Sequence, residues 1–213
     1  MTLERSGCGV LSVAGRVLAL FVAIAACFPL AQARELRLVT VGTSLTAVGG
    51  WQAPLEQALA ACKNTPVTII NLGVGSSNSR HGLERIEAVL AARPDVVLYE
   101  FSINDAYVKF EVSLPESRNN TLKFIDNVGN SARIILMTMN PTHGAVADVR
   151  PELADYYRLY RAIAAERGLG LVDNAVDWAK QNDLSTAIPD GVHPTVEAAA
   201  GIIVPNVVRL LCP

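Results

Sequence analysis

The sequence contains a serine, a histidine and an aspartate whose positions suit nucleophilic attack on a carbonyl group. Ser44 lies in the segment Val41–Thr46, between an apolar run and a segment with helical periodicity. Asp190 and His193 are three positions apart in a loop that ends with Pro194. This spacing lets Asp190 orient one imidazole nitrogen and leave the other for Ser44, which is the arrangement that acyl transfer requires. An ordinary surface loop with an aspartate and a histidine fits the spacing as well.

Acyl transfer also needs hydrogen-bond donors for the oxyanion that forms on the substrate. Asn104 follows an apolar strand and carries a neutral amide donor, and the glycine-rich loop 73–77 offers backbone N–H groups. Each has an alternative interpretation, because asparagine and glycine are also common turn residues. The convergence of these segments with Ser44 at the carboxyl ends of strands favours a shared site.

Hydrophobic periodicity predicts five strands that alternate with helices, as in a parallel sheet with helices on both faces. The expected strands cover residues 36–40, 67–71, 96–101, 133–139 and 171–173. The expected helices cover residues 51–63, 79–92, 114–129, 151–167, 174–181 and 195–211, and Pro205 should kink the last of them. Two longer loops, 106–113 and 140–150, are expected to shape the substrate pocket.

Composition excludes several classes of protein. The chain has 213 residues, of which 51% are hydrophobic and 18% charged, so it can bury a full core. A net charge of −2 without a basic patch argues against nucleic acid as a partner. The three histidines and the cysteine spacing predict no metal site. His81 and His143 are expected at the surface or in a pocket wall.

Two other motifs are incomplete. The segment Gly73-Val74-Gly75 lacks the third glycine of a dinucleotide-binding loop, because Asn78 occupies that position. The nucleophile elbow of ordinary α/β-hydrolases, G-x-S-x-G, is missing from the sequence.

The first 33 residues have the features of an export signal. Arg5 and Arg16 precede the apolar run 17–26, and Ala31-Gln32-Ala33 offers small residues for cleavage. Two alternatives are a retained membrane anchor and a lipoprotein signal, in which Cys27 becomes the lipidated first residue. Cleavage after residue 33 would remove two arginines and one glutamate and leave a charge of −3. We therefore expect a periplasmic or secreted protein with one domain, 34–213, and no stable insertion in the membrane.

Four segments, in order, resemble the conserved blocks of the SGNH, or GDSL, hydrolase superfamily. They are Gly42-Thr43-Ser44-Leu45, Asn71-Leu72-Gly73-Val74-Gly75-Ser76, Ser102-Ile103-Asn104-Asp105 and Asp190-Gly191-Val192-His193-Pro194. The resemblance covers nearly all of the expected mature chain. It implies a flavodoxin-like three-layer α/β/α fold with a mostly parallel five-stranded sheet, and ester or thioester hydrolysis without a metal or cofactor.

The resemblance also assigns roles to residues. It implies that Ser44 is the nucleophile and that the backbone N–H groups of Ser44 and Ser76, with the Asn104 side chain, form the oxyanion hole. Gly75 is an alternative to Ser76. There are three departures from the family pattern: Thr43 replaces the usual aspartate, Ser76 stands where we align a glycine, and Ser102 replaces a glycine, which is expected to narrow the pocket.

These observations predict an exported serine esterase that acts on carboxylic esters, with O-acetylated glycans as the first expectation. A lysophospholipase or acyl-thioesterase is the alternative within the family, and a non-catalytic anion-binding module is the alternative outside it. In the flavodoxin-like order the first and last helices share a face of the sheet. Cys62 and Cys212 should then meet at the edge away from Ser44 and form a disulfide.

Overall fold

The computed structural model describes residues 34–212, so the expected signal and the alternative lipidation at Cys27 lie outside the described residues. Five parallel strands form one sheet in the order β2-β1-β3-β4-β5. They are β1 (Leu36–Gly42), β2 (Val67–Asn71), β3 (Val96–Glu100), β4 (Arg133–Thr138) and β5 (Gly170–Asp173). The predicted parallel α/β fold with five strands is confirmed.

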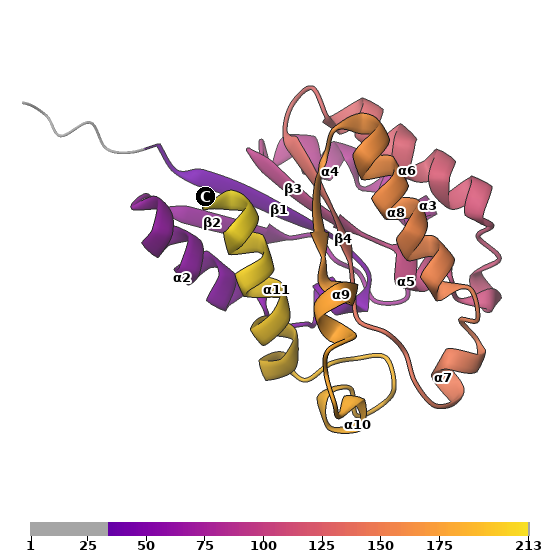
Figure 1. Ribbon diagram of the computed structural model, residues 1–213. Helices are drawn as coiled ribbons and strands as arrows, with labels where there is room; N and C mark the ends of the chain where they lie inside the picture. Colours follow the sequence, from indigo (N-terminus) through magenta and orange to yellow (C-terminus); the bar gives the residue numbers. More distant parts are fainter. Residues whose placement is uncertain (1–33, 213) are drawn as a thin grey trace, which may run out of the picture. The chain divides into compact units, whose positions relative to one another are not determined.

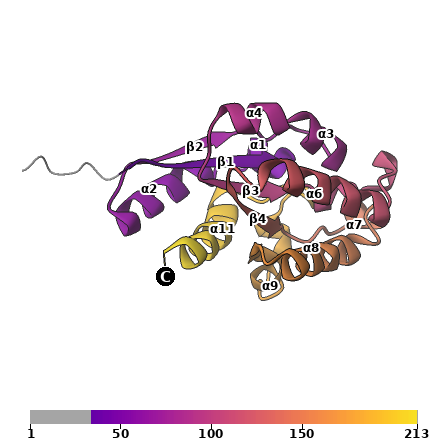
Figure 2. The same ribbon diagram turned by 90° about the horizontal axis from the view of Figure 1, so that it is seen from above.

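Helices cover both faces of this sheet (Figure 1, Figure 2). The longer ones are α2 (Gln52–Lys63), α6 (Leu114–Val128), α8 (Leu153–Arg167) and α11 (Val196–Leu211). The shorter ones are α1 (Ser44–Ala47), α3 (Ser79–Glu84), α4 (Ile86–Ala91), α5 (Ser102–Asp105), η1 (Val108–Phe110), α7 (Ala145–Asp148), α9 (Asn174–Trp178) and α10 (Leu184–Ala187). Helices α2 and α11 pack side by side, and α6 packs against α3, α4 and α8.

The strands are hydrophobic on both sides because both faces are covered by helices. Side chains alternate between the faces along each strand. Leu38 and Leu98 belong to the cluster beneath α2 and α11, whereas their neighbours Val39 and Val97 belong to the cluster beneath α4 and α6. All four side chains are at most 1% exposed. The sheet is therefore a rigid base for the loops at its carboxyl edge.

The structure differs from the sequence-based elements in several places. The helix expected at 79–92 is divided at Arg85, because the Arg85 N–H donates to the carbonyl of Gly82, three residues earlier. Ser44 and Asn104, which we expected in loops, lie in the short helices α1 and α5. The loops 106–113 and 140–150 contain η1 and α7. Helix α11 continues through Pro205, and the kink there stays a prediction.

The strand order places two chain segments at one crevice. The chain leaves β1 toward β2 on one side, whereas β3 pairs with β1 on the other side. In open α/β sheets, ligands bind at this switch point, beyond the carboxyl ends of the strands. Ser44 follows β1 and Asn104 follows β3, so both belong to this crevice.

At the amino ends of the strands, away from Ser44, the ends of α2 and α11 come together. The structure joins Cys62 to Cys212 by a disulfide, with their Cα atoms 6.2 Å apart.

No helix within residues 34–212 is long and apolar enough to cross a membrane.

Candidate active site

Ser44 is presented by the one-turn helix α1. Thr43 caps this helix, because its hydroxyl oxygen accepts the N–H of Leu45 at 3.2 Å. The indole N–H of Trp51 donates to the Leu45 carbonyl at 3.0 Å. A single helical turn is unstable by itself, so these contacts with neighbouring residues hold Ser44 at the end of β1.

The structure brings Ser44, His193 and Asp190 into one chain of hydrogen bonds. Oγ of Ser44 lies 2.8 Å from Nε2 of His193, and Nδ1 of His193 lies 2.6 Å from Oδ2 of Asp190. With the ring proton on Nδ1, donated to Asp190, Nε2 is free to accept the proton of the Ser44 hydroxyl. The arrangement is the one that nucleophilic acyl transfer needs.

Asp190 is held in its ionised form by donors from its own loop. Partial burial raises the pKa of Asp190, but hydrogen bonds from His193 and from the N–H of Val192 outweigh it and hold the pKa at about 2. The carboxylate accepts the backbone N–H groups of His193 at 2.7 Å and Val192 at 2.9 Å. Asp190 therefore stays negative throughout the pH range in which a histidine titrates.

The loop that carries Asp190 and His193 is braced by the loop after β4. The side chain of Asn140 donates to the Val192 carbonyl at 2.8 Å, and Nε2 of His143 donates to the Ile188 carbonyl at 2.8 Å. Gly191 has a φ of +84°, and a Cβ there would lie 2.6 Å from the His143 carbonyl oxygen. Sequence reasoning placed His143 at the surface or in a pocket wall and missed this bracing role.

Several N–H donors belong to residues that line the cavity beside Ser44. The Ser44 N–H belongs to the first turn of α1, which has no helical acceptor. Within residues 34–212, the N–H groups of Gly75 and Ser76 donate to no backbone acceptor. The amide nitrogen of Asn104 donates to the Ser77 carbonyl at 2.8 Å, which fixes the amide and leaves its second N–H free. These are the groups that an oxyanion hole requires.

A cavity of about 220 Å³ contains Ser44 and His193. Tyr107 and Phe110 form one wall, with their rings at 87° and their centroids 5.2 Å apart. The other lining residues are Gly75, Ser76, Asn104, Arg150 and Val192. The expectation that Ser102 narrows the pocket is wrong, because Ser102 is fully buried at the start of α5 and does not line this cavity.

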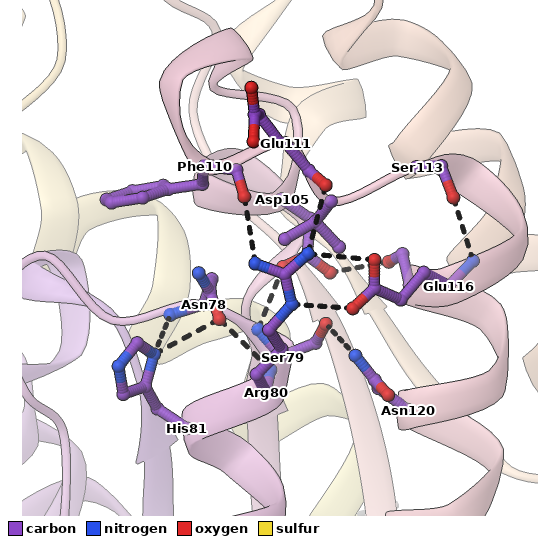
Figure 3. A network of polar contacts seen from close by, with 12 residues as sticks. Asn78, Ser79, Arg80, His81, Asp105, Phe110, Glu111, Ser113, Glu116 and Asn120 are labelled. Carbon is purple, nitrogen blue, oxygen red and sulfur yellow. Dashed lines mark hydrogen bonds and ion pairs between the residues drawn. The ribbon is translucent and has the colours of Figure 1, made fainter.

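A polar network holds the backbone of the segment that contains Phe110 (Figure 3). The Arg80 guanidinium donates to the carbonyl oxygens of Phe110 and Glu111, both at 3.0 Å, and pairs with the carboxylate of Glu116. Asp105 is buried and accepts the N–H of Ser79 at 2.8 Å. The network therefore ties the loop that contains Phe110 to the starts of α3 and α6.

Burial makes Asp105 an unusual acid. Burial raises the pKa of Asp105 to about 6, although hydrogen bonds from Ser117 and Ser79 lower it. Because it faces these residues and lies outside the cavity that contains Ser44, its contacts are structural. His81 is also structural: its Nδ1 accepts the N–H of Asn78 at 3.2 Å in the capping box of α3.

Sequence reasoning missed two charged residues near Ser44. Glu100 is 1% exposed, and its carboxylate accepts hydrogen bonds from Thr43 and from the Thr46 hydroxyl. Arg150 lines the cavity itself. A charge at the end of the apolar strand 96–100 was a detectable signal for Glu100, whereas Arg150 stands in a loop with no pattern that marks it.

Within residues 34–212, no cluster of three potential metal ligands is present.

Comparison with known proteins identifies a matching family model and structures with a similar fold. The model of the GDSL-like Lipase/Acylhydrolase family matches residues 39–200. The acetylxylan esterase Axe2 from Geobacillus stearothermophilus has a similar structure, with a TM-score of 0.73 and 24% identity over 83% of this chain and 94% of Axe2. A lipase/acylhydrolase from Enterococcus faecalis has a TM-score of 0.76 and 21% identity over 83% of this chain and 95% of that one. Comparison with curated proteins gives no match.

Proposed function

The chain belongs to the GDSL-like lipase/acylhydrolase family. Within this family, we propose that it is an exported serine esterase that removes short acyl groups from glycans. The observation that carries the proposal is the continuous chain of hydrogen bonds from Ser44 through His193 to Asp190. A non-catalytic anion-binding module would leave this chain of contacts without a role.

In the proposed reaction, Ser44 is the nucleophile. His193 takes the proton from the Ser44 hydroxyl as its oxygen attacks the ester carbonyl, and then gives the proton to the leaving alcohol. Asp190 holds the imidazole in the required tautomer and stabilises the imidazolium that forms. Water then hydrolyses the acyl-enzyme, with His193 acting as the base again. No metal or cofactor is needed for these steps.

The oxyanion would be held by the backbone N–H groups of Ser44 and Ser76 and by the amide of Asn104. Charge develops on this oxygen only as the tetrahedral intermediate forms, so donors aimed at it lower the barrier. Gly75 stands beside Ser76 in the cavity lining, and its N–H is an alternative donor. Ser76 has a φ of +57°, which strains a residue with a side chain. Such strain is consistent with a backbone position that is fixed for function.

The cavity supports a small acyl group on a sugar. Its volume of about 220 Å³ is small for a long acyl chain. Tyr107 and Phe110 offer flat apolar surface of the kind on which a sugar ring can pack. The name of Axe2 describes an esterase of acetylated xylan, which is consistent with this substrate class. We propose O-acetylated glycans, in preference to lysophospholipids or acyl-thioesters.

Export is supported by the sequence pattern of residues 1–33 and by the Cys62–Cys212 disulfide, since disulfides persist in oxidising compartments. The proposed location is the periplasm or the outside of the cell.

A substrate panel tests the proposal. The mature protein should hydrolyse acetylated xylooligosaccharides and 4-nitrophenyl acetate much faster than 4-nitrophenyl palmitate or palmitoyl-coenzyme A. Higher kcat/KM on the palmitoyl substrates would contradict the proposed acyl specificity.

A further inference from the structure

Arg150 places a permanent positive charge in the wall of the cavity that contains Ser44. The residue is only 8% exposed. Nε donates to the Ile103 carbonyl at 3.0 Å and Nη1 to the Val146 carbonyl at 3.3 Å. The guanidinium carbon lies 4.4 Å from the centroid of the Tyr107 ring. These contacts hold the guanidinium in one orientation.

No carboxylate neutralises this charge within residues 34–212. Arg150 forms no ion pair there, and its Nη2 forms no hydrogen bond. Burial lowers the pKa of Arg150 from 12.5, and the groups that oppose this effect are two tyrosines, Tyr107 and Tyr157, with no acid among them. Arginine nevertheless stays protonated in proteins. A buried charge is more stable when it is paired with an opposite charge, so the Arg150 guanidinium favours a substrate that carries an anionic group.

The other residues that line the cavity do not fill this role. None of them is a carboxylate, and Asp190 lies behind His193 on the far side from the nucleophile. A substrate that enters therefore meets Ser44 and a preorganised guanidinium in the same small space. Guanidinium groups bind carboxylates by short, charge-assisted hydrogen bonds.

We propose that Arg150 is a specificity-determining residue that binds a carboxylate carried by the ester substrate. This inference rests on the proposed esterase function. The carboxylate can belong to the alcohol side of the ester, as in an acidic sugar, or to the acyl side, as in a half-ester of a dicarboxylic acid. Both sources present the same chemistry to Arg150.

Matched substrates test the inference without any variant. One arm compares an O-acetylated uronic acid oligosaccharide with its methyl ester, which keeps the sugar and the acetyl group but removes the negative charge. The other arm compares 4-nitrophenyl hemisuccinate with 4-nitrophenyl butyrate. We expect kcat/KM to be about tenfold or more higher for the charged member of one arm, since hydrogen bonds to charged groups are among the stronger ones. The arm that shows the preference identifies the side of the ester.

Variants assign the preference to Arg150. Arg150→Met keeps the apolar stem and should abolish the preference while the neutral substrates are still hydrolysed. Lys109→Met is the matched control: it removes an exposed positive charge near Tyr107 and should leave the preference unchanged. If Arg150→Met does not fold, competitive inhibition of the wild-type enzyme by the free uronate and by its methyl ester gives the same comparison.

The outcomes separate the two proposals. Hydrolysis of charged and neutral members at equal kcat/KM in both arms would overturn the anion site and leave the esterase intact; Arg150 would then only hold the Ile103 and Val146 carbonyls. Failure to hydrolyse any ester would contradict the esterase itself.

Discussion

The carboxylate of Glu100 accepts a hydrogen bond from the backbone N–H of Thr43 at 2.7 Å, directly before Ser44. The same carboxylate oxygen accepts the hydroxyl of Thr46 at 2.6 Å, so it holds both ends of α1. A Cβ on Gly42 would lie 2.2 Å from this oxygen, which explains the glycine at this position. In the family pattern an aspartate precedes the serine. Here Thr43 takes that position and β3 supplies a carboxylate to the same turn.

This contact predicts a pH dependence of stability. Burial raises the pKa of Glu100 from 4.5 to about 7, against hydrogen bonds from Thr46 and Thr43 that lower it. Between these two values the folded protein holds a proton that the unfolded chain releases. The stabilisation that this bound proton adds to the folded state is complete below pH 4.5 and is lost as the pH rises through about 7. The free energy of unfolding therefore falls over this interval.

Urea unfolding at pH 5 and pH 7.5 measures this effect. Glu100→Gln imitates the protonated carboxyl at both pH values. Between pH 5 and pH 7.5 its free energy of unfolding should therefore fall by up to about 3 kcal/mol less than that of the wild type. Asp105, whose pKa is also raised, contributes a decrease in the same direction in both proteins, so the comparison is made on the difference between them. An equal decrease in the wild type and in Glu100→Gln would show that Glu100 does not carry a proton in the folded state.

The sequence was sufficient to predict the parallel fold and the meeting of Ser44, His193 and Asp190 at its carboxyl edge. Alternating apolar segments determine a parallel sheet, and the ends of β1 and β3 then place Ser44 beside Asn104. Contacts that depend on loop packing were not predictable. The orientation of Arg150 depends on the Ile103 and Val146 carbonyls, and that of His143 on the carbonyl of Ile188, which no local pattern encodes.

Asn104 separates transition-state stabilisation from binding. Asn104→Ala removes the side-chain donor that the Ser77 carbonyl orients, and should lower kcat by about 10²–10³ with little change in KM. Steady-state kinetics on 4-nitrophenyl acetate measures both parameters. A wild-type kcat in Asn104→Ala would exclude this amide from the oxyanion hole.

Two neighbouring variants serve as controls. Ser76→Gly keeps the backbone N–H and relieves the positive φ, so kcat should change far less than in Asn104→Ala. Asp105→Asn alters the acceptor for the Ser79 N–H and the Ser117 hydroxyl, so it should lower the melting temperature more than kcat. A large loss of kcat in Ser76→Gly would point to a role for the Ser76 hydroxyl in substrate binding.

The Cys62–Cys212 disulfide should stabilise the fold without affecting the chemistry. It joins α2 to the end of α11 at the edge of the sheet away from Ser44 and closes a loop with a sequence separation of 150. The double variant Cys62→Ala/Cys212→Ala should lose roughly 2–4 kcal/mol of unfolding free energy and keep its kcat. Thiol titration of the denatured exported protein should find neither cysteine free. Two reactive thiols from these positions would contradict the bond.

The most direct test of the account is covalent labelling by a fluorophosphonate, followed by mass spectrometry of the digested protein. We predict one adduct, on the peptide that contains Ser44, because His193 activates only this hydroxyl. Ser44→Ala should give no adduct, and His193→Ala, which keeps the serine, should react far more slowly. An adduct on another residue would contradict the assignment of Ser44 as the nucleophile. So would a Ser44→Ala variant that hydrolyses 4-nitrophenyl acetate at the wild-type rate.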